Sequence, residues 1–145
     1  MAQVIVTAER EVAGSQTQVR AALADYAQTR PKILTANFSE YQVREGGTGA
    51  GTTVSWRFAA TSKRVRDQLV EVSEPGDGSL VESDANSSLV TTWTVADAGE
   101  GRSRVAVRTT WDGAGGIGGF FERTFAPKGL RRVYDEMIGK LETVV

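Results

Sequence analysis

The C-terminal segment, residues 116–145, constrains the fold more than any other stretch, because it carries an apolar stripe at helical spacing that is long enough to span a small domain. Charged side chains such as Arg131, Asp135 and Lys140 fall on the opposite face. Most of the stability of such a helix comes from packing its apolar face, so the rest of the chain must supply a large partner surface. The stripe consists of Leu130, Val133, Tyr134, Met137, Leu141 and Val144.

The first part of the same segment does not continue this stripe. Ile117, Phe121 and Phe125 form a second apolar stripe, which points about half a turn away at 100° per residue. Pro127 lies between the two stripes and removes one helical hydrogen bond. We therefore predict a break near residues 126–127. Residues 113–125 would then form a short aromatic segment that either gates the space under the helix or makes a fixed corner.

Most of the chain between Phe38 and Trp111 alternates apolar and polar residues, which is typical of half-buried strands. Turn-forming residues separate the strands, above all the glycine-rich run 46–51 and the sequence EPGDG at 74–78. Short connections between consecutive strands favour an antiparallel meander. The predicted strands cover residues 38–44, 52–60, 63–72, 80–82, 89–95 and 104–111.

The N-terminal part adds one more strand and two short helices. Residues 3–12 alternate as a strand. Ser15 followed by Gln18 has the spacing of a capping box, so a helix should begin there and end near Thr29, before Pro31. A second helical turn over residues 31–34 would point its apolar side chains inward. No internal repeat or linker interrupts the 145 residues, so we expect a single domain, 1–145.

Composition excludes several classes of function. The chain contains no cysteine and no histidine, which removes thiolate and imidazole metal ligands and the commonest general base near neutral pH. A net charge of −1 argues against a nucleic-acid partner. No apolar run is long enough to span a bilayer, and the N-terminus lacks a signal-peptide core. We expect a cytoplasmic protein, a monomer or weak homodimer, that needs no cofactor and no metal.

The order strand, two helices, six strands and long helix, together with the stretches SQTQVRAALADY, GTTVSWRF and SEPGDGSL, resembles the START/Bet v 1-like superfamily and its polyketide cyclase/dehydrase proteins. That resemblance implies an α+β helix-grip fold. A seven-stranded curved antiparallel sheet would wrap around the long C-terminal helix and leave a cavity between them. Members of the superfamily bind sterols, lipids, polyketides and other hydrophobic molecules there; some are enzymes and many are carriers.

The motif GAGGIG, residues 113–118, matches the glycine pattern of dinucleotide-binding loops. Such a loop also requires a following parallel strand and an acidic residue about 20 positions later. Here the chain ends in a predicted helix. We interpret the glycines as a flexible connection and not as a cofactor site.

The aromatic residues on the inward faces of the strands have two interpretations, which the sequence leaves open. They either fill the core or line a pocket whose ligand completes the packing. Two inward threonines could supply polar contacts, although β-propensity alone also explains them. The predicted cavity residues are Trp56, Phe58, Thr91, Trp93, Thr109, Trp111, Phe121, Phe125, Tyr134 and Met137.

Candidates for catalysis are few. Asp112 follows the last predicted strand, where it is also an ordinary turn residue, and Tyr134 could donate a hydrogen bond to a ligand carbonyl. Strand alternation places Arg57 and Arg108 outside, and Arg66 is assigned to neither face. The resemblance supplies no fixed catalytic motif that these residues match.

The first functional hypothesis is therefore the binding or carriage of a small hydrophobic ligand, such as a lipid, a polyketide or an aromatic molecule, in an internal cavity. The alternative is a polyketide cyclase/aromatase or dehydrase, which would act mainly by holding a flexible chain in a reactive conformation. A second alternative is a protein-interaction module, such as a toxin-like relative, that uses the outer face of the sheet.

Overall fold

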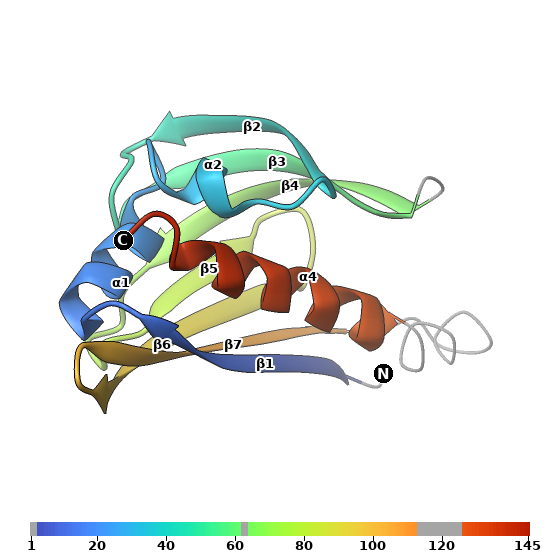
Figure 1. The fold of residues 1–145 in the computed structure, drawn as a ribbon. Helices are drawn as coiled ribbons and strands as arrows, with labels where there is room; N and C mark the ends of the chain where they lie inside the picture. Colours follow the sequence, from blue (N-terminus) through green and yellow to red (C-terminus); the bar gives the residue numbers. More distant parts are fainter. Residues whose placement is uncertain (1–2, 62–63, 113–125) are drawn as a thin grey trace.

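A curved antiparallel sheet of seven strands surrounds one long helix in the computed structural model, which describes residues 3–61, 64–112 and 126–145 (Figure 1). The strand order is β1-β7-β6-β5-β4-β3-β2, so the first strand pairs with the last and the others follow as a meander. The strands are β1 (Gln3–Ala13), β2 (Phe38–Glu45), β3 (Thr53–Thr61), β4 (Arg64–Ser73), β5 (Leu80–Asp84), β6 (Val90–Gly99) and β7 (Arg102–Asp112).

All the predicted strands are present, and alternation gave the correct inner face for β1, β3, β6 and β7, the strands to which it assigned one. In β7, for example, Val105, Val107, Thr109 and Trp111 are buried while Arg104 and Arg108 are exposed. The connection between the predicted strands 89–95 and 104–111 is shorter than expected, because β6 extends to Gly99 and β7 begins at Arg102. Glu100 and Gly101 alone make the turn, and both have positive φ angles of 53° and 74°.

Helix α1 (Gln16–Ala24) begins with the predicted capping box. The Ser15 hydroxyl accepts a hydrogen bond from the Gln18 amide, and the Gln18 side chain accepts one from the Ser15 amide. The expected end near Thr29 is wrong, since the helix stops at Ala24. The Asp25 carboxylate accepts hydrogen bonds from the Gln28 amide and the Thr29 hydroxyl, which stabilises a separate turn. Helix α2 (Arg30–Ile33) follows, with Pro31 in its first turn.

Helix α4 (Ala126–Leu141) lies across the concave face of the sheet, with Pro127 in its first turn. Its predicted stripe packs inward, and Ile138, which was not assigned to the stripe, is also fully buried. Arg131 and Lys140 fix the helix by donating hydrogen bonds to the carbonyls of Thr7 in β1 and Leu34 after α2. The predicted aromatic gate over residues 113–125, with Phe121, Phe125 and the glycine motif, lies outside the described residues.

The core fills the space between the concave sheet face, α4 and the two short helices. Its largest fully buried side chains come from all of these elements and include Trp93, Tyr26, Leu23, Ile33 and Leu80. None of the helices in the described ranges is long and apolar enough to cross a lipid bilayer.

We expect Ser15→Ala to lower the free energy of unfolding by about 1 kcal/mol, because it leaves the Gln18 amide at the start of α1 without its capping partner. Urea titration followed by circular dichroism measures the change. The matched control is Thr17→Ala in the same turn, where the side chain is exposed and the expected change is near zero. Equal losses for the two variants would contradict the importance of the capping box.

Candidate functional site

The predicted cavity residues within the described ranges all face the interior between the sheet and α4. Seven of them are buried, and Phe58 is partly buried against the same core. They come from three strands and one helix, so the fold brings together residues that are far apart in sequence. The buried members are Trp56, Thr91, Trp93, Thr109, Trp111, Tyr134 and Met137.

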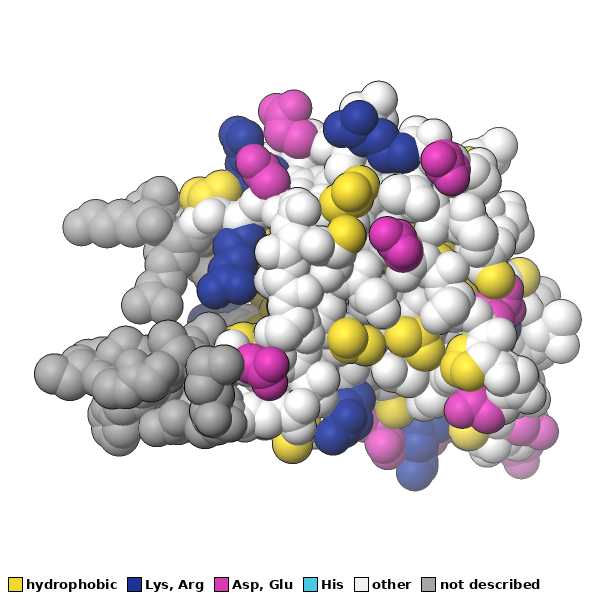
Figure 2. All heavy atoms as spheres, turned by 180° about the vertical axis from the view of Figure 1, so that it is seen from behind, with side chains coloured by type: hydrophobic (Ala, Val, Ile, Leu, Met, Phe, Trp, Pro, Cys, Tyr) yellow, Lys and Arg dark blue, Asp and Glu magenta, His cyan; other side chains and the backbone are white. Residues whose placement is uncertain are grey.

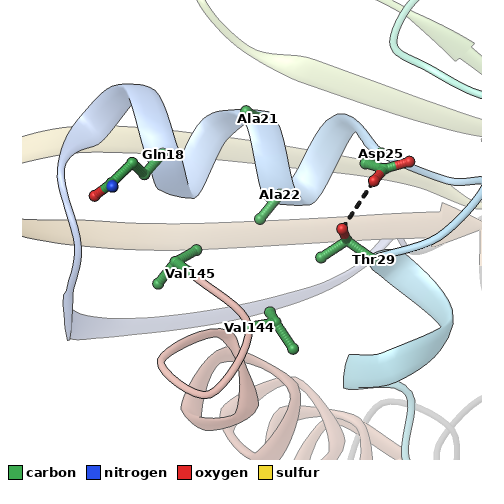
Figure 3. Close-up of a pocket in the computed structure, with 7 residues that line it drawn as sticks. All are labelled: Gln18, Ala21, Ala22, Asp25, Thr29, Val144 and Val145. Carbon is green, nitrogen blue, oxygen red and sulfur yellow. Dashed lines mark hydrogen bonds between the residues drawn. The ribbon is translucent and has the colours of Figure 1, made fainter.

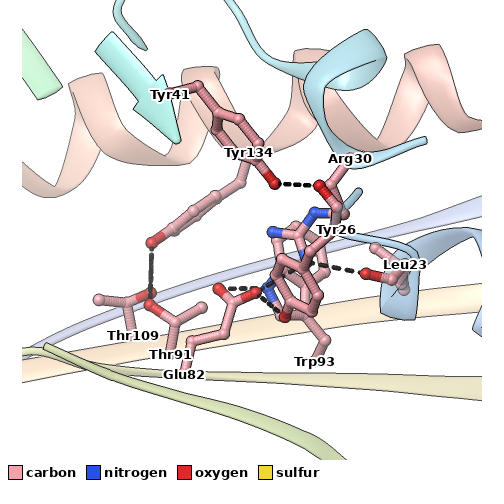
Figure 4. A network of polar contacts seen from close by, with 9 residues as sticks. All are labelled: Leu23, Tyr26, Arg30, Tyr41, Glu82, Thr91, Trp93, Thr109 and Tyr134. Carbon is pink, nitrogen blue, oxygen red and sulfur yellow. Dashed lines mark hydrogen bonds and ion pairs between the residues drawn. The ribbon is translucent and has the colours of Figure 1, made fainter. Parts of the chain in front are cut away.

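Three hydroxyl groups form a cluster under α4. Thr91 and Thr109 are direct partners across β6 and β7, and their Oγ1 atoms are 2.8 Å apart. The hydroxyl of Tyr134 descends from α4, bonds to Thr109 Oγ1 and lies 3.5 Å from Thr91 Oγ1 (Figure 4). The threonines therefore do more than favour strand structure, since they satisfy a buried phenol.

The environment of Tyr134 keeps its phenol protonated. Burial raises the pKa of Tyr134 to about 12, although hydrogen bonds with Thr109 and Thr91 act to lower it. A phenol with this pKa is a poor general base near neutral pH, but it remains a hydrogen-bond donor.

A buried ion pair lies beside this cluster, and the sequence analysis did not predict it. Nη1 of Arg30 in α2 is 2.7 Å from Oε2 of Glu82 in β5, and the two side chains are only 3% and 5% exposed. Tyr26 donates its hydroxyl proton to the same carboxylate oxygen, and Nε1 of Trp93 donates to Oε1 at 3.1 Å. Trp93 also packs edge-on against Tyr134, with ring centroids 5.9 Å apart, so it joins the ion pair to the hydroxyl cluster.

The surroundings of Arg30 keep its guanidinium charged. Burial is the largest single effect and would lower the pKa of Arg30, but the charge of Glu82, its hydrogen bond and the nearby tyrosines together hold that pKa above its ordinary value. Burial, followed by the charge of Glu82, raises the pKa of Tyr26. Moving two charges out of water costs several kcal/mol for each ion, which good geometry and added hydrogen bonds offset. The three donors around Glu82 provide such an offset.

One local signal could have revealed half of this network. In β5 the alternation places Leu80, Glu82 and Asp84 on the inner face, so Glu82 is a carboxylate at a core position. The predicted strand ended at Glu82, and neither of its faces was assigned to the interior. Arg30 gives no comparable signal, because a four-residue helix has no periodicity to indicate its direction. Tyr26 falls within the first predicted helix, which was expected to end near Thr29, but in the structure it follows that helix.

Trp56 belongs to a second aromatic group near the other edge of the sheet. Its Nε1 donates to Gln68 Oε1 at 2.6 Å, and the ring of Tyr41 stacks on it with an interplanar angle of 5°. Phe38 contacts both Trp56 and Phe58. These partners satisfy and enclose Trp56, so the core-filling interpretation fits it well.

The catalytic candidates named from the sequence do not converge on the interior. The side chain of Asp112 is exposed at the end of β7. Arg57, Arg66 and Arg108 are exposed too, as alternation predicted for Arg57 and Arg108, and Arg57 pairs with Asp67 at 2.8 Å. Among the described residues, no group of three or more acidic side chains is placed to hold a metal ion.

A surface hollow of about 330 Å³ lies elsewhere, between α1 and the C-terminal residues (Figure 3). No predicted cavity residue lines it. Its polar groups include Asp25 and Thr29, which already bond to each other. Its walls are Gln18, Ala21, Ala22, Asp25, Thr29, Val144 and Val145. The aromatic and hydroxyl groups under α4, together with the buried ion pair, are therefore the better candidate site.

The sequence matches the family model described as polyketide cyclase / dehydrase and lipid transport, over residues 3–145. The chain belongs to this family. No curated protein matches the sequence.

Solved structures of related proteins extend this assignment. The KanY protein, known from a solution structure, is 50% identical and superposes with a TM-score of 0.89, covering 99% of this chain and 98% of its own. The Zhui aromatase/cyclase from Streptomyces sp. R1128 is 12% identical, with a TM-score of 0.75 over 99% of this chain and 93% of its own. Norcoclaurine synthase from Thalictrum flavum, in complex with dopamine and hydroxybenzaldehyde, is 14% identical, with a TM-score of 0.70 over 99% and 86%.

The two enzymes are similar to this chain in fold alone at these identities. Together with a START superfamily protein from Mycobacterium smegmatis, 11% identical with a TM-score of 0.75 over 97% of this chain and 99% of its own, they confirm the helix-grip fold of the START/Bet v 1-like superfamily. The family includes both transport and cyclase members by its description, so membership does not choose between the two roles.

All three tyrosines should resist ionisation in the folded protein. Burial raises the pKa of Tyr41 and of Tyr134 to about 12, and it raises that of Tyr26 further. Unfolded tyrosine ionises at about 10, so the unfolded state loses its protons first. The stabilisation is therefore complete below about pH 10 and is lost as the pH rises toward about 12. Tyrosinate absorbance at about pH 11 should be small until denaturant is added.

The matched control for this titration is Tyr134→Phe. It should remove one tyrosine from the absorbance that appears on unfolding and should leave the other two protected. Ionisation of the folded protein with a midpoint near 10 would contradict the buried geometry.

Breaking the buried ion pair should destabilise the fold strongly. Arg30→Met leaves the Glu82 carboxylate buried without its cation, and we expect the free energy of unfolding to fall by about 3–5 kcal/mol. Arg30→Met combined with Glu82→Gln should cost less than the sum of the two single changes. Urea unfolding of the four proteins gives the coupling energy. The control is the exposed pair of Arg57 and Asp67, for which the corresponding single and double variants should show little coupling. Equal coupling energies in the two pairs would contradict the strong interaction expected of the buried pair.

Proposed function

We propose that this protein binds a small, largely apolar molecule between the concave face of the sheet and α4. The observation that carries the proposal is the meeting of Trp93, Thr91, Thr109 and Tyr134 on one inner surface. Ligand pockets are typically walled by aromatic groups and contain a few convergent polar groups, and this surface has that composition. Membership in a family described by lipid transport and cyclisation supports the proposal.

The driving force would be the burial of apolar ligand surface, worth roughly 25 cal/mol per Å². The polar groups would orient the ligand. Tyr134 is suited to this role, since its raised pKa keeps the phenol neutral and able to donate.

A cyclase or dehydrase activity is the second candidate. The observation that favours it is the buried pair of Arg30 and Glu82, since interior charges are costly and are concentrated at functional sites. Such an enzyme would hold a flexible substrate against polar groups in a reactive conformation. The exposed position of Asp112 and the protonated state of Tyr134 argue against either residue as the general base.

The outer face of the sheet gives less support to an interaction module. Figure 2 shows charged side chains of both signs and scattered apolar groups on this face. Among the described residues, the exposed large apolar side chains are Ile5, Val65 and Val145, which belong to different elements or the C-terminus. Ion pairs across neighbouring strands account for part of the charge: Glu9 with Arg104, Glu11 with Arg102, and Arg57 with Asp67.

Protein purified from its own host should carry an apolar molecule that solvent extraction and mass spectrometry detect. Met137→Trp, which adds volume to the inner face of α4, should reduce the bound fraction at least about tenfold, because displaced ligand surface loses its burial energy. The matched control is Glu136→Trp, one residue away on the exposed face. It should retain the molecule.

Circular dichroism of both variants checks that the fold is kept, and Met137→Phe serves as a milder change if overpacking unfolds the first variant. Absence of any extracted molecule, together with no binding of an apolar fluorescent probe, would refute the proposal. Incubation with a candidate polyketide separates the two candidates, since a carrier would release it unchanged whereas a cyclase would convert it.

A further inference from the structure

Within the described part of the chain, Arg30 makes hydrogen bonds through only one of its three guanidinium nitrogens. Nη1 donates to Glu82 Oε2 at 2.7 Å and to the Leu23 carbonyl at 3.0 Å. Nε is sealed from solvent and is the one buried side-chain nitrogen or oxygen in the described residues that has no hydrogen-bond partner. Nη2 makes no hydrogen bond with the described residues either. One edge of the guanidinium, formed by Nε and Nη2, is therefore unused.

The Nε–Nη2 edge is the part of Arg30 that can still donate hydrogen bonds. The guanidinium carbon lies 4.7 Å from the ring centre of Tyr26 and 5.2 Å from that of Trp93, so aromatic rings cover its faces. Glu82 is already engaged by Tyr26, Arg30 and Trp93. Arg30 reaches this interior from α2, and Tyr134 reaches it from α4, with Trp93 in contact with both (Figure 4).

A buried donor without an acceptor is costly, and the cost is larger when the donor is charged. Buried groups of this kind are normally satisfied by a ligand or by an ordered water. Two adjacent N–H groups on one guanidinium edge match a single oxygen with two lone pairs or a carboxylate in bidentate geometry.

Charge separates these possibilities. Arg30 and Glu82 already neutralise each other. A carboxylate on the free edge would add a second buried negative charge close to Glu82, and like charges in a site of low dielectric repel strongly. A neutral carbonyl oxygen adds no charge and still accepts from a charged donor, which gives a stronger hydrogen bond than a neutral donor does.

We propose that the Nε–Nη2 edge of Arg30 binds a neutral carbonyl oxygen of the ligand, so that the protein selects ketone-like or quinone-like apolar molecules over hydrocarbons and carboxylates of the same shape. The inference rests on the proposed function, because it assigns the polar end of the same ligand. Arg30 acts here as a specificity-determining binding residue. Glu82 is its positioning partner, and Tyr26 and Trp93 hold that carboxylate in place.

Three probes with one ring system test the assignment by isothermal titration calorimetry: acetylnaphthalene, isopropenylnaphthalene and naphthoate, all substituted at the same ring position. The second replaces the carbonyl oxygen by a methylene group, and the third replaces the ketone by a carboxylate. The ketone should bind at least about tenfold more tightly than the alkene, as expected for one hydrogen bond from a charged donor. It should also bind more tightly than naphthoate.

Two variants locate the preference. Arg30→Lys keeps the positive charge but has no second N–H edge, and Arg30→Met with Glu82→Gln removes the pair without leaving a buried charge. In both, the ratio of ketone to alkene affinity should fall to within about threefold of unity. Arg57→Lys, on the exposed outer face, is the matched control and should keep the wild-type ratio.

Infrared spectroscopy of an isotope-labelled ketone gives a readout that does not depend on variant stability. The carbonyl stretch should move to lower frequency in the wild-type complex, because a charged donor polarises the bond. Arg30→Lys should reduce the shift.

Equal binding of ketone and alkene to the wild-type protein would overturn the assignment and leave an ordered water as the partner of Arg30. Tightest binding of naphthoate would overturn it as well, as would a ketone preference that survives in Arg30→Lys. If none of the three probes binds, the proposed binding site between the sheet and α4 is refuted, and the role of Arg30 in it is refuted as well. If all bind without a ketone preference, only the role of Arg30 is refuted.

Discussion

The buried ion pair between Arg30 and Glu82 is the interaction on which the interior of this protein depends. It joins a short helix to the middle of the sheet, and Tyr26 and Trp93 complete the shell around the carboxylate. Two charges that are almost fully buried are tolerated only when their geometry and hydrogen bonds offset the loss of water. The pair therefore fixes where α2 sits relative to β5, and it makes one end of the interior polar.

The other polar part of the interior is the hydroxyl cluster, and Trp93 lies between the two. Thr91 and Thr109 come from neighbouring strands, while Tyr134 comes from α4, so the cluster ties the helix to the sheet that it covers. The interior thus has an aromatic wall with a charged end and a neutral hydroxyl end. That arrangement suits recognition of an apolar molecule with a few oxygen atoms better than proton abstraction, since the raised pKa of Tyr134 keeps its proton in place.

The helix-grip architecture explains why carriers and enzymes share one family. A strongly curved sheet and one long helix define an interior whose lining can change without altering the strand order, and function then lies in the particular side chains. In this chain the distinguishing feature of the lining is an arginine whose Nη1 donates to Glu82, while its buried Nε has no hydrogen-bond partner among the described residues.

The sequence by itself determined the strands, the capped start of α1, the buried stripe of α4 and the inward direction of Thr91, Thr109 and Trp93, because these follow from periodicity and local turn chemistry. It did not determine that α1 ends at Ala24, because the turn that follows depends on hydrogen bonds to the Asp25 side chain, which compete with continuation of the helix. Only the tertiary structure decided the pairing of Arg30 with Glu82, which are 52 residues apart. Periodicity assigns a side chain to a face, whereas a partner across the interior depends on which elements become neighbours when the sheet curves around α4.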